Sequence, residues 1–252
     1  MRKFNFPTLL KVMALIIVIG AVIYSFKNQR PDQKKIIIPA QSVHYFKDPS
    51  LSLDKISLKI IYFIPKDRSA SINQSWKELI EPAVKDLQSF HKIQFDNRSV
   101  INYEIFPDPV IGLLEAIDYD TQDTNRGNPY ALSAITDELQ NRFFDPAGDF
   151  YKGNFAKTES EDFSVIYIIY QGVGASGIQG SALLSLSYFI NAEFSGYKES
   201  LFYHEFAHTL GMPDRFDEES HIYTSFDILG NGKIRPLANA YIDFETKKEM
   251  GF

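Results

Sequence analysis

The sequence of 252 residues contains no cysteine. This absence excludes disulfide bonds, thiolate metal sites, cysteine nucleophiles and lipid attachment to an N-terminal cysteine. The sequence also lacks internal repeats and low-complexity tracts. It contains instead 44% hydrophobic residues, with 14 tyrosines and 21 phenylalanines. This composition and length are typical of a packed globular body with a sizeable core.

Acidic residues are missing from the start of the chain, because the first one is Asp32. Five of the 26 lysines and arginines precede Pro31, so the chain from there on carries 21 basic and 32 acidic residues, a formal charge of −11. A nucleic-acid-binding surface needs clustered lysine and arginine side chains that neutralise phosphates. We therefore do not expect nucleic acid as a partner.

An apolar run from Thr8 to Phe26 is interrupted only by Lys11. A helix of about 20 apolar residues spans a bilayer, so residues 1–30 are predicted to be a signal anchor with a transmembrane helix. No small-x-small cleavage site follows the run, which favours a single-pass protein of the cell membrane over a secreted one. Basic residues on both sides leave the orientation open. Residues 31–54, rich in turn formers, are predicted to be a tether.

The remaining residues, 55–252, alternate between strand-like and helix-like segments, which indicates an α/β domain. Runs of β-branched and aromatic residues predict strands over residues 55–65, 99–107, 162–170 and 181–189. Apolar residues at helical spacing predict helices over residues 71–93, 129–144 and 198–210. We place the strand 181–189 at an edge of the sheet. Residues 171–180, with four glycines, are predicted to be a loop and lack the lysine of a phosphate-binding loop.

Two histidines lie four residues apart in "LFYHEFAHTLGMPDRF", residues 201–216. On a helix, His204 and His208 share one face, so their imidazole nitrogens can hold one zinc ion at about 2.0–2.1 Å. Glu205 lies about 100° further round the helix. From there its carboxylate can reach a metal-bound water rather than the metal, which is the geometry that a general base needs.

A third ligand has to return to the same face after the helix ends, because catalytic zinc usually has three protein ligands. Gly211 permits a sharp turn, and Pro213 prevents the helix from continuing. Asp214 follows, with His221 as the alternative. A helix whose histidines only fill the core would need neither the glycine turn nor the returning carboxylate. The predicted metal ligands are therefore His204, His208 and Asp214.

The stretch "HEFAHTLGMPD" resembles the zinc signature of the metzincin clan in its aspartate version. Together with "SFDILGNG" and "LANAYIDFETKKEMGF", it is similar to the immune inhibitor A-like bacterial metallopeptidases over residues 163–252. The resemblance implies a zincin-like mixed sheet with an active-site helix and a C-terminal helix. It implies a zinc-dependent endopeptidase that binds Zn²⁺ and uses Glu205 as the general base on a protein or peptide substrate. We expect a monomer.

One departure from that family concerns the turn beneath the zinc, where Leu229 stands in place of methionine. Leucine is an apolar residue of similar size, so we expect altered activity rather than loss. The tyrosine that some clan members carry just after this turn is absent, and Tyr223 or Tyr241 could stabilise the oxyanion instead. These departures permit an alternative function, a non-catalytic surface-anchored binding domain that retains the fold.

The other histidines and acidic residues are predicted to have no role in the site. His44 and His91 are expected at the surface. The acidic run of residues 217–219 could bind calcium but is expected to be a solvated loop. The substrate is expected to lie extended beside the edge strand 181–189.

Overall fold

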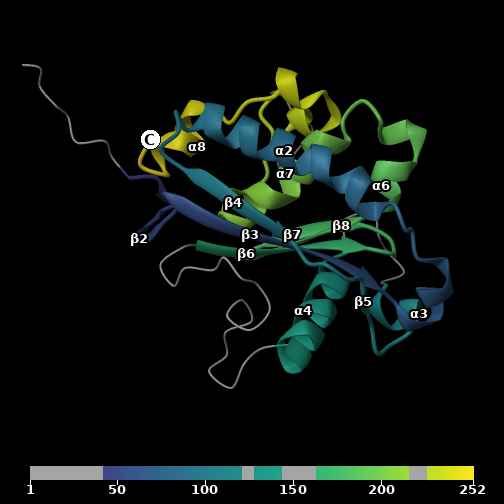
Figure 1. The fold of residues 1–252 in the computed structure, drawn as a ribbon. Coiled ribbons are helices and arrows are strands. Elements are labelled where there is room, and N and C mark those ends of the chain that lie inside the picture. The colour runs from purple at the N-terminus through teal and green to yellow at the C-terminus, as the bar shows by residue number, and fades with distance from the viewer. Residues whose placement is uncertain (1–41, 121–127, 144–162, 216–225) are drawn as a thin grey trace, which may run out of the picture. The chain divides into compact units, whose positions relative to one another are not determined.

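The computed structural model describes residues 42–120, 128–143, 163–215 and 226–252, which belong to one unit that spans residues 41–252 (Figure 1). The predicted membrane anchor at residues 1–30 lies outside the described residues. Among the helices that are described, none is long and apolar enough to cross a membrane.

A mixed, mostly parallel sheet forms the centre of this unit, which confirms the predicted α/β class. Its strands lie in the order β4–β3–β6–β8–β7, and β5 also pairs with β3. All pairings are parallel except that between β7 and β8. The strands are β3 (Lys55–Ile64), β4 (Val100–Ile105), β5 (Val110–Ile111), β6 (Phe163–Tyr170), β7 (Ala175–Ile178) and β8 (Ser181–Ser185).

Helices cover both faces of the sheet (Figure 1). Side chains alternate along β3, so Ile60 and Tyr62 enter one apolar cluster while Ile61 and Phe63 enter the other. The first cluster includes residues of α2 (Trp76–Gln94) and α7 (Lys198–Thr209). The second includes residues of α4 (Pro129–Phe143). Burial on both faces explains why the central strands are almost wholly apolar.

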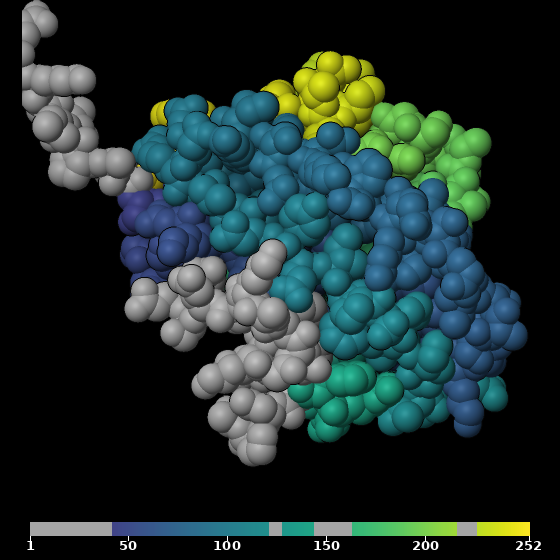
Figure 2. Space-filling view, in the orientation of Figure 1, coloured from purple at the N-terminus to yellow at the C-terminus, as the bar shows by residue number. Residues whose placement is uncertain are grey.

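Short helices connect and flank these elements. Their bounds are α3 (Ala116–Tyr119), α6 (Ser187–Ile190), α8 (Phe244–Lys248), and the 3₁₀ helices η1 (Lys66–Ser71), η2 (Ala192–Phe194), η3 (Asn231–Ile234) and η4 (Leu237–Asn239). Figure 2 shows part of this arrangement from outside, with the yellow C-terminal residues and the light green segment around α6 bordering α2.

The prediction of an edge strand at residues 181–189 is wrong. β8 lies between β6 and β7, all five of its residues are buried, and Ser187–Ile190 is helical. The edge strand on this side is β7, which lies within the glycine-rich residues that were predicted to be a loop. β7 was missed because a four-residue strand with a glycine shows no apolar alternation.

The predicted tether reaches too far along the chain. Within it, β1 (His44–Tyr45) pairs with β2 (Asp48–Ser52), and both Val43 and Leu53 are fully buried. The backbone N–H of His44 donates to the carbonyl oxygen of Met250 at 3.0 Å. The residues from 42 onwards therefore belong to the folded unit, because their few apolar side chains have partners from distant parts of the chain.

Candidate metal centre

The two histidines of α7 point their Nε2 atoms at one another across 3.2 Å. The Nδ1 of His204 lies 2.9 Å from the carbonyl oxygen of Ile228, and the Nδ1 of His208 lies 2.8 Å from that of Met212. A carbonyl oxygen only accepts, so each Nδ1 carries the proton and donates. Each Nε2 is left with a free lone pair, which is the tautomer that a metal ligand needs.

The chain turns back at Gly211, where φ is +83°, a conformation that favours glycine. A Cβ at Gly211 would also meet the ring of Tyr45 at 2.5 Å. After this turn, the Oδ1 of Asp214 lies 3.4 Å from the Nε2 of His204 and 3.7 Å from the Nε2 of His208. The structure thus brings the three predicted ligands together.

The three donor atoms fit a small tetrahedral cation. An ion that binds its ligands at about 2.0–2.1 Å holds them roughly 3.3–3.4 Å from one another. The separations here are 3.2, 3.4 and 3.7 Å, which lie on either side of that value. Potential ligand atoms of His204, Glu205 and His208 also lie within 4.8 Å of one another. The cluster could therefore hold a metal ion.

Burial dominates the electrostatics of the cluster. It lowers the pKa of His204, and the charges of His208 and Lys233 lower it further, so the neutral form that binds metals is favoured. Burial raises the pKa of Glu205 to about 8, while the charge of Lys233 opposes this shift and that of Asp214 increases it. Lys233 lies on η3, which packs against α7. No motif in the sequence pointed to this lysine.

The turn from Asp227 to Gly230 contacts the histidine helix α7 at His204. The N–H of Leu229 donates to the Oδ1 of Asp227 at 2.7 Å, and the N–H of Gly230 donates to the carbonyl oxygen of Asp227 at 2.9 Å. Leu229 is fully buried in the apolar cluster that contains α7. The turn therefore packs against α7, and the carbonyl oxygen of Ile228 within it accepts the Nδ1 proton of His204.

The edge strand β7 passes directly over α7 at the histidines. A Cβ at Gly177 would lie 2.4 Å from the carbonyl oxygen of Glu205 and 2.7 Å from the Cβ of His208. Only glycine permits this approach without a shift of strand or helix. β7, which is the last strand of the sheet among the described residues, and the candidate metal cluster are thus neighbours.

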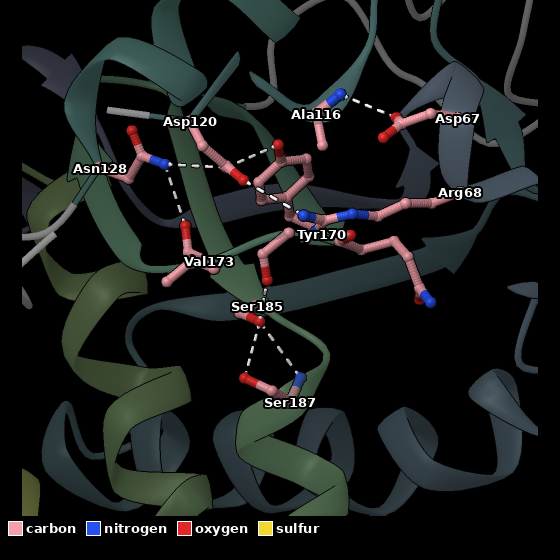
Figure 3. A network of polar contacts seen from close by, with 11 residues as sticks. Asp67, Arg68, Ala116, Asp120, Asn128, Tyr170, Val173, Ser185 and Ser187 are labelled. Atoms are coloured by element: carbon pink, nitrogen blue, oxygen red, sulfur yellow. Dashed lines mark hydrogen bonds and ion pairs between the residues drawn. The ribbon is translucent and has the colours of Figure 1, made fainter. Parts of the chain in front are cut away.

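A polar network holds the loop that leads into β7 (Figure 3). Arg68 Nη1 donates to the carbonyl oxygen of Gln171 at 2.7 Å. The side-chain amide of Asn128 donates to the carbonyl oxygen of Val173 at 3.0 Å, and its backbone N–H donates to that of Ala175 at 2.9 Å. These bonds fix the first residue of the edge strand.

The other candidate residues lie elsewhere. The prediction that His91 is at the surface is wrong: it is fully buried, with Nδ1 2.9 Å from the hydroxyl of Tyr203 and Nε2 2.7 Å from that of Ser99. His44 is half-buried and is the first residue of β1. Tyr241 forms a backbone bridge with Asp227 and is 42% exposed. Residues 217–219, His221 and Tyr223 lie outside the described residues.

The chain matches no protein-family model and no curated protein. Among solved structures, it is similar to metalloproteinase-II from Bacteroides fragilis, with a TM-score of 0.44 and 13% sequence identity. The match covers 84% of this chain and 57% of that one, so this chain spans a little over half the length of that protein. The geometry of the site, rather than a relative, is what supports a function.

Proposed function

We propose that the protein is a zinc-dependent endopeptidase in which His204, His208 and Asp214 hold the metal and Glu205 is the general base. The convergence of three donor atoms at 3.2–3.7 Å carries this proposal. Two imidazoles and one carboxylate form a ligand set that zinc accepts, and a three-ligand site leaves a position for water or substrate.

Zinc, when bound, supplies Lewis acidity that polarises the substrate carbonyl and makes a water molecule more acidic. Burial favours the protonated form of Glu205, whereas a bound cation beside it would favour the carboxylate. That carboxylate can accept a proton from the water and pass it to the leaving amine. The positive charge of Lys233, which acts on both His204 and Glu205, favours the negative charge that develops on the substrate oxygen.

The proposed substrate is an extended peptide that pairs with the outer side of β7 beyond Ala175, whose carbonyl oxygen already accepts the N–H of Asn128. β-Augmentation of this kind uses backbone hydrogen bonds, and it tolerates many side chains. Gly177 places the middle of β7 against Glu205 and His208, so a peptide on this edge would run past the metal cluster. This places the substrate on β7 instead of the strand 181–189 that the sequence suggested.

We also propose that residues 8–26 anchor the protein in the cell membrane as a single-pass, monomeric protein with its catalytic unit outside the cell. The predominantly apolar run from Val12 to Phe26, which carries no charge, supports the anchor. Alkaline carbonate extraction tests it: the full chain should stay in the membrane pellet, and a chain without residues 1–30 should not. Release of the full chain by carbonate would contradict an integral anchor.

The catalytic proposal is tested with the full chain in detergent. Glu205→Ala should keep zinc, measured by atomic emission, and lose cleavage of a denatured-protein substrate by about 10²–10⁴-fold. His208→Ala should lose zinc. Glu199→Ala, on the same helix, is the matched control and should change neither. Normal cleavage by Glu205→Ala would refute the mechanism. Zinc binding without any cleavage by the parent chain would favour the binding-domain alternative.

A further inference from the structure

Asp214 lies just after α7, in residues 212–215, which form neither helix nor strand. Its position therefore depends on its neighbours along the chain. On one side Met212 is buried, and its carbonyl oxygen accepts the Nδ1 proton of His208. On the other side is Arg215. Arg215 lies outside the sequence motif of the proposed ligands, and contacts with distant residues hold it in place.

Arg215 is held at three atoms. Its backbone N–H donates to the carbonyl oxygen of Leu229 at 2.8 Å. Its Nε lies 3.3 Å from the Oδ2 of Asp243, and its Nη2 donates to the Oγ1 of Thr246 at 2.5 Å. The contact of Nε with Asp243 is an ion pair and not a hydrogen bond, because this buried Nε has no hydrogen-bond partner among the described residues. The planar guanidinium group is therefore oriented by the hydrogen bond from Nη2 and by the attraction between the two charges. The residue after the third ligand is thereby tied to the start of α8.

The partner of Arg215 is itself fixed. Asp243 is the N-cap of α8, where its Oδ1 accepts the N–H of Thr246 at 2.9 Å. Its own backbone N–H donates to the Oδ2 of Asp227 at 2.6 Å. Burial alone would raise the pKa of Asp243, but the hydrogen bonds from Thr246 and the charge of Arg215 hold it below its usual range. Arg215 therefore faces a charged and oriented carboxylate.

The turn from Asp227 to Gly230 supports two ligands at once. The carbonyl oxygen of Ile228 accepts the Nδ1 proton of His204, and the carbonyl oxygen of Leu229 accepts the backbone N–H of Arg215. Asp227 links this turn to α8 through the N–H of Asp243. A displacement of α8 would therefore move the supports of both ligands together.

We propose that Arg215 is a positioning residue for the ligand Asp214, and that its ion pair with Asp243 makes α8 part of the metal site. The inference rests on the proposed function, because it assigns Arg215 a role toward the metal. Partners of metal ligands that lie outside the first coordination shell typically change metal affinity about 10–100-fold when they are removed.

The test compares zinc affinity in full-length variants by competition with a chromophoric chelator. Arg215→Met keeps the apolar stem and removes the donors, and it should weaken zinc binding about 10–100-fold. Arg215→Lys keeps the positive charge but lacks the planar set of guanidinium donors, so it should give an intermediate loss of zinc affinity. Asp243→Asn should weaken binding in the same direction. Lys248→Met, an exposed charge on α8, is the matched control and should leave zinc affinity unchanged.

A second readout separates positioning from mere support of the fold. Cobalt(II) replaces zinc, and its visible absorption reports the coordination geometry; Arg215→Met should change this spectrum. If Arg215→Met lowers the melting temperature of the metal-free chain but binds zinc as tightly as the parent, the proposal is overturned. If Arg215→Met does not fold, wild-type affinity in Arg215→Lys and Asp243→Asn overturns it. Failure of the parent chain to bind zinc would overturn both this inference and the proposed function.

Discussion

The close approach of β7 to α7 makes a Gly177→Ala substitution a sharp test of the proposed substrate position. The added Cβ would lie 2.4 Å from the carbonyl oxygen of Glu205 and 2.7 Å from the Cβ of His208. Both contacts are shorter than van der Waals distance by roughly 1 Å. Because α7 is packed on the sheet and β7 pairs with only one strand among the described residues, we expect β7 to move by about that amount.

A displacement of about 1 Å in a substrate-positioning element can reduce the rate about 10²-fold. Gly177→Ala should therefore lower kcat/KM for a peptide by about 10²-fold, while zinc content stays at the parent level. Overpacking should also cost about 1–3 kcal/mol of the free energy of unfolding. Steady-state kinetics with a quenched fluorescent peptide measures the first effect, and urea unfolding measures the second.

Gly196→Ala is the matched control, because a Cβ at Gly196 would meet no described atom within 4 Å apart from its neighbours in the chain. It should leave both the activity and the stability close to those of the parent. Parent-like kcat/KM in Gly177→Ala, with folding and zinc content intact, would show that peptides do not bind along β7 and would refute the reasoning.

Four further results are expected. Burial lowers the pKa of His91 to about 3 from 6.5, so the folded state stays unprotonated while the unfolded state gains a proton as the pH falls below 6.5. Between pH 7.5 and pH 5 this difference lowers the free energy of unfolding by about 2 kcal/mol, which urea unfolding in EDTA can measure. The variant His91→Gln should lack this loss, whereas the control Gln88→Ala should lower the free energy of unfolding by the same amount at both pH values. Lys233→Met should lower kcat/KM about 10–100-fold with zinc retained, and an unchanged rate would exclude Lys233 from catalysis. Leu229→Met should change stability by under about 1.5 kcal/mol and leave zinc bound; loss of the metal would contradict a packing role. Removal of zinc by EDTA should lower the melting temperature, because an ion at 100 times its Kd stabilises the folded state by about 2.7 kcal/mol. Calorimetry that shows no shift in melting temperature would contradict zinc binding to the folded state.

The central layers of the fold were predictable because their residues follow simple periodicities. The helix expected over residues 71–93 is seen as α2 (Trp76–Gln94), and the strand over residues 162–170 is seen as β6. β8 was found as a strand, but its position in the sheet was not, because five consecutive buried residues look alike at an edge and in the interior. Strand order depends on pairings between distant segments, which a local pattern does not contain.

The metal cluster was predictable to a similar degree. Spacing alone placed His204 and His208 on one face, and the glycine turn suggested where Asp214 returns. The contacts around the cluster were not predictable, because they join residues far apart in the sequence. Arg215 meets Asp243, and Lys233 acts on Glu205, only after the chain from residue 226 onwards has packed against α7.

The link between α8 and the ligand supports has a consequence for biosynthesis. A ribosome makes the chain from its N-terminus, so Asp243 and Thr246 emerge after every proposed ligand has already left the exit tunnel. Until they emerge, Arg215 has no clamp and the strand pair at His44 lacks its contact with Met250. The candidate metal centre would therefore gain the contacts that hold Arg215 only after this later segment has been made.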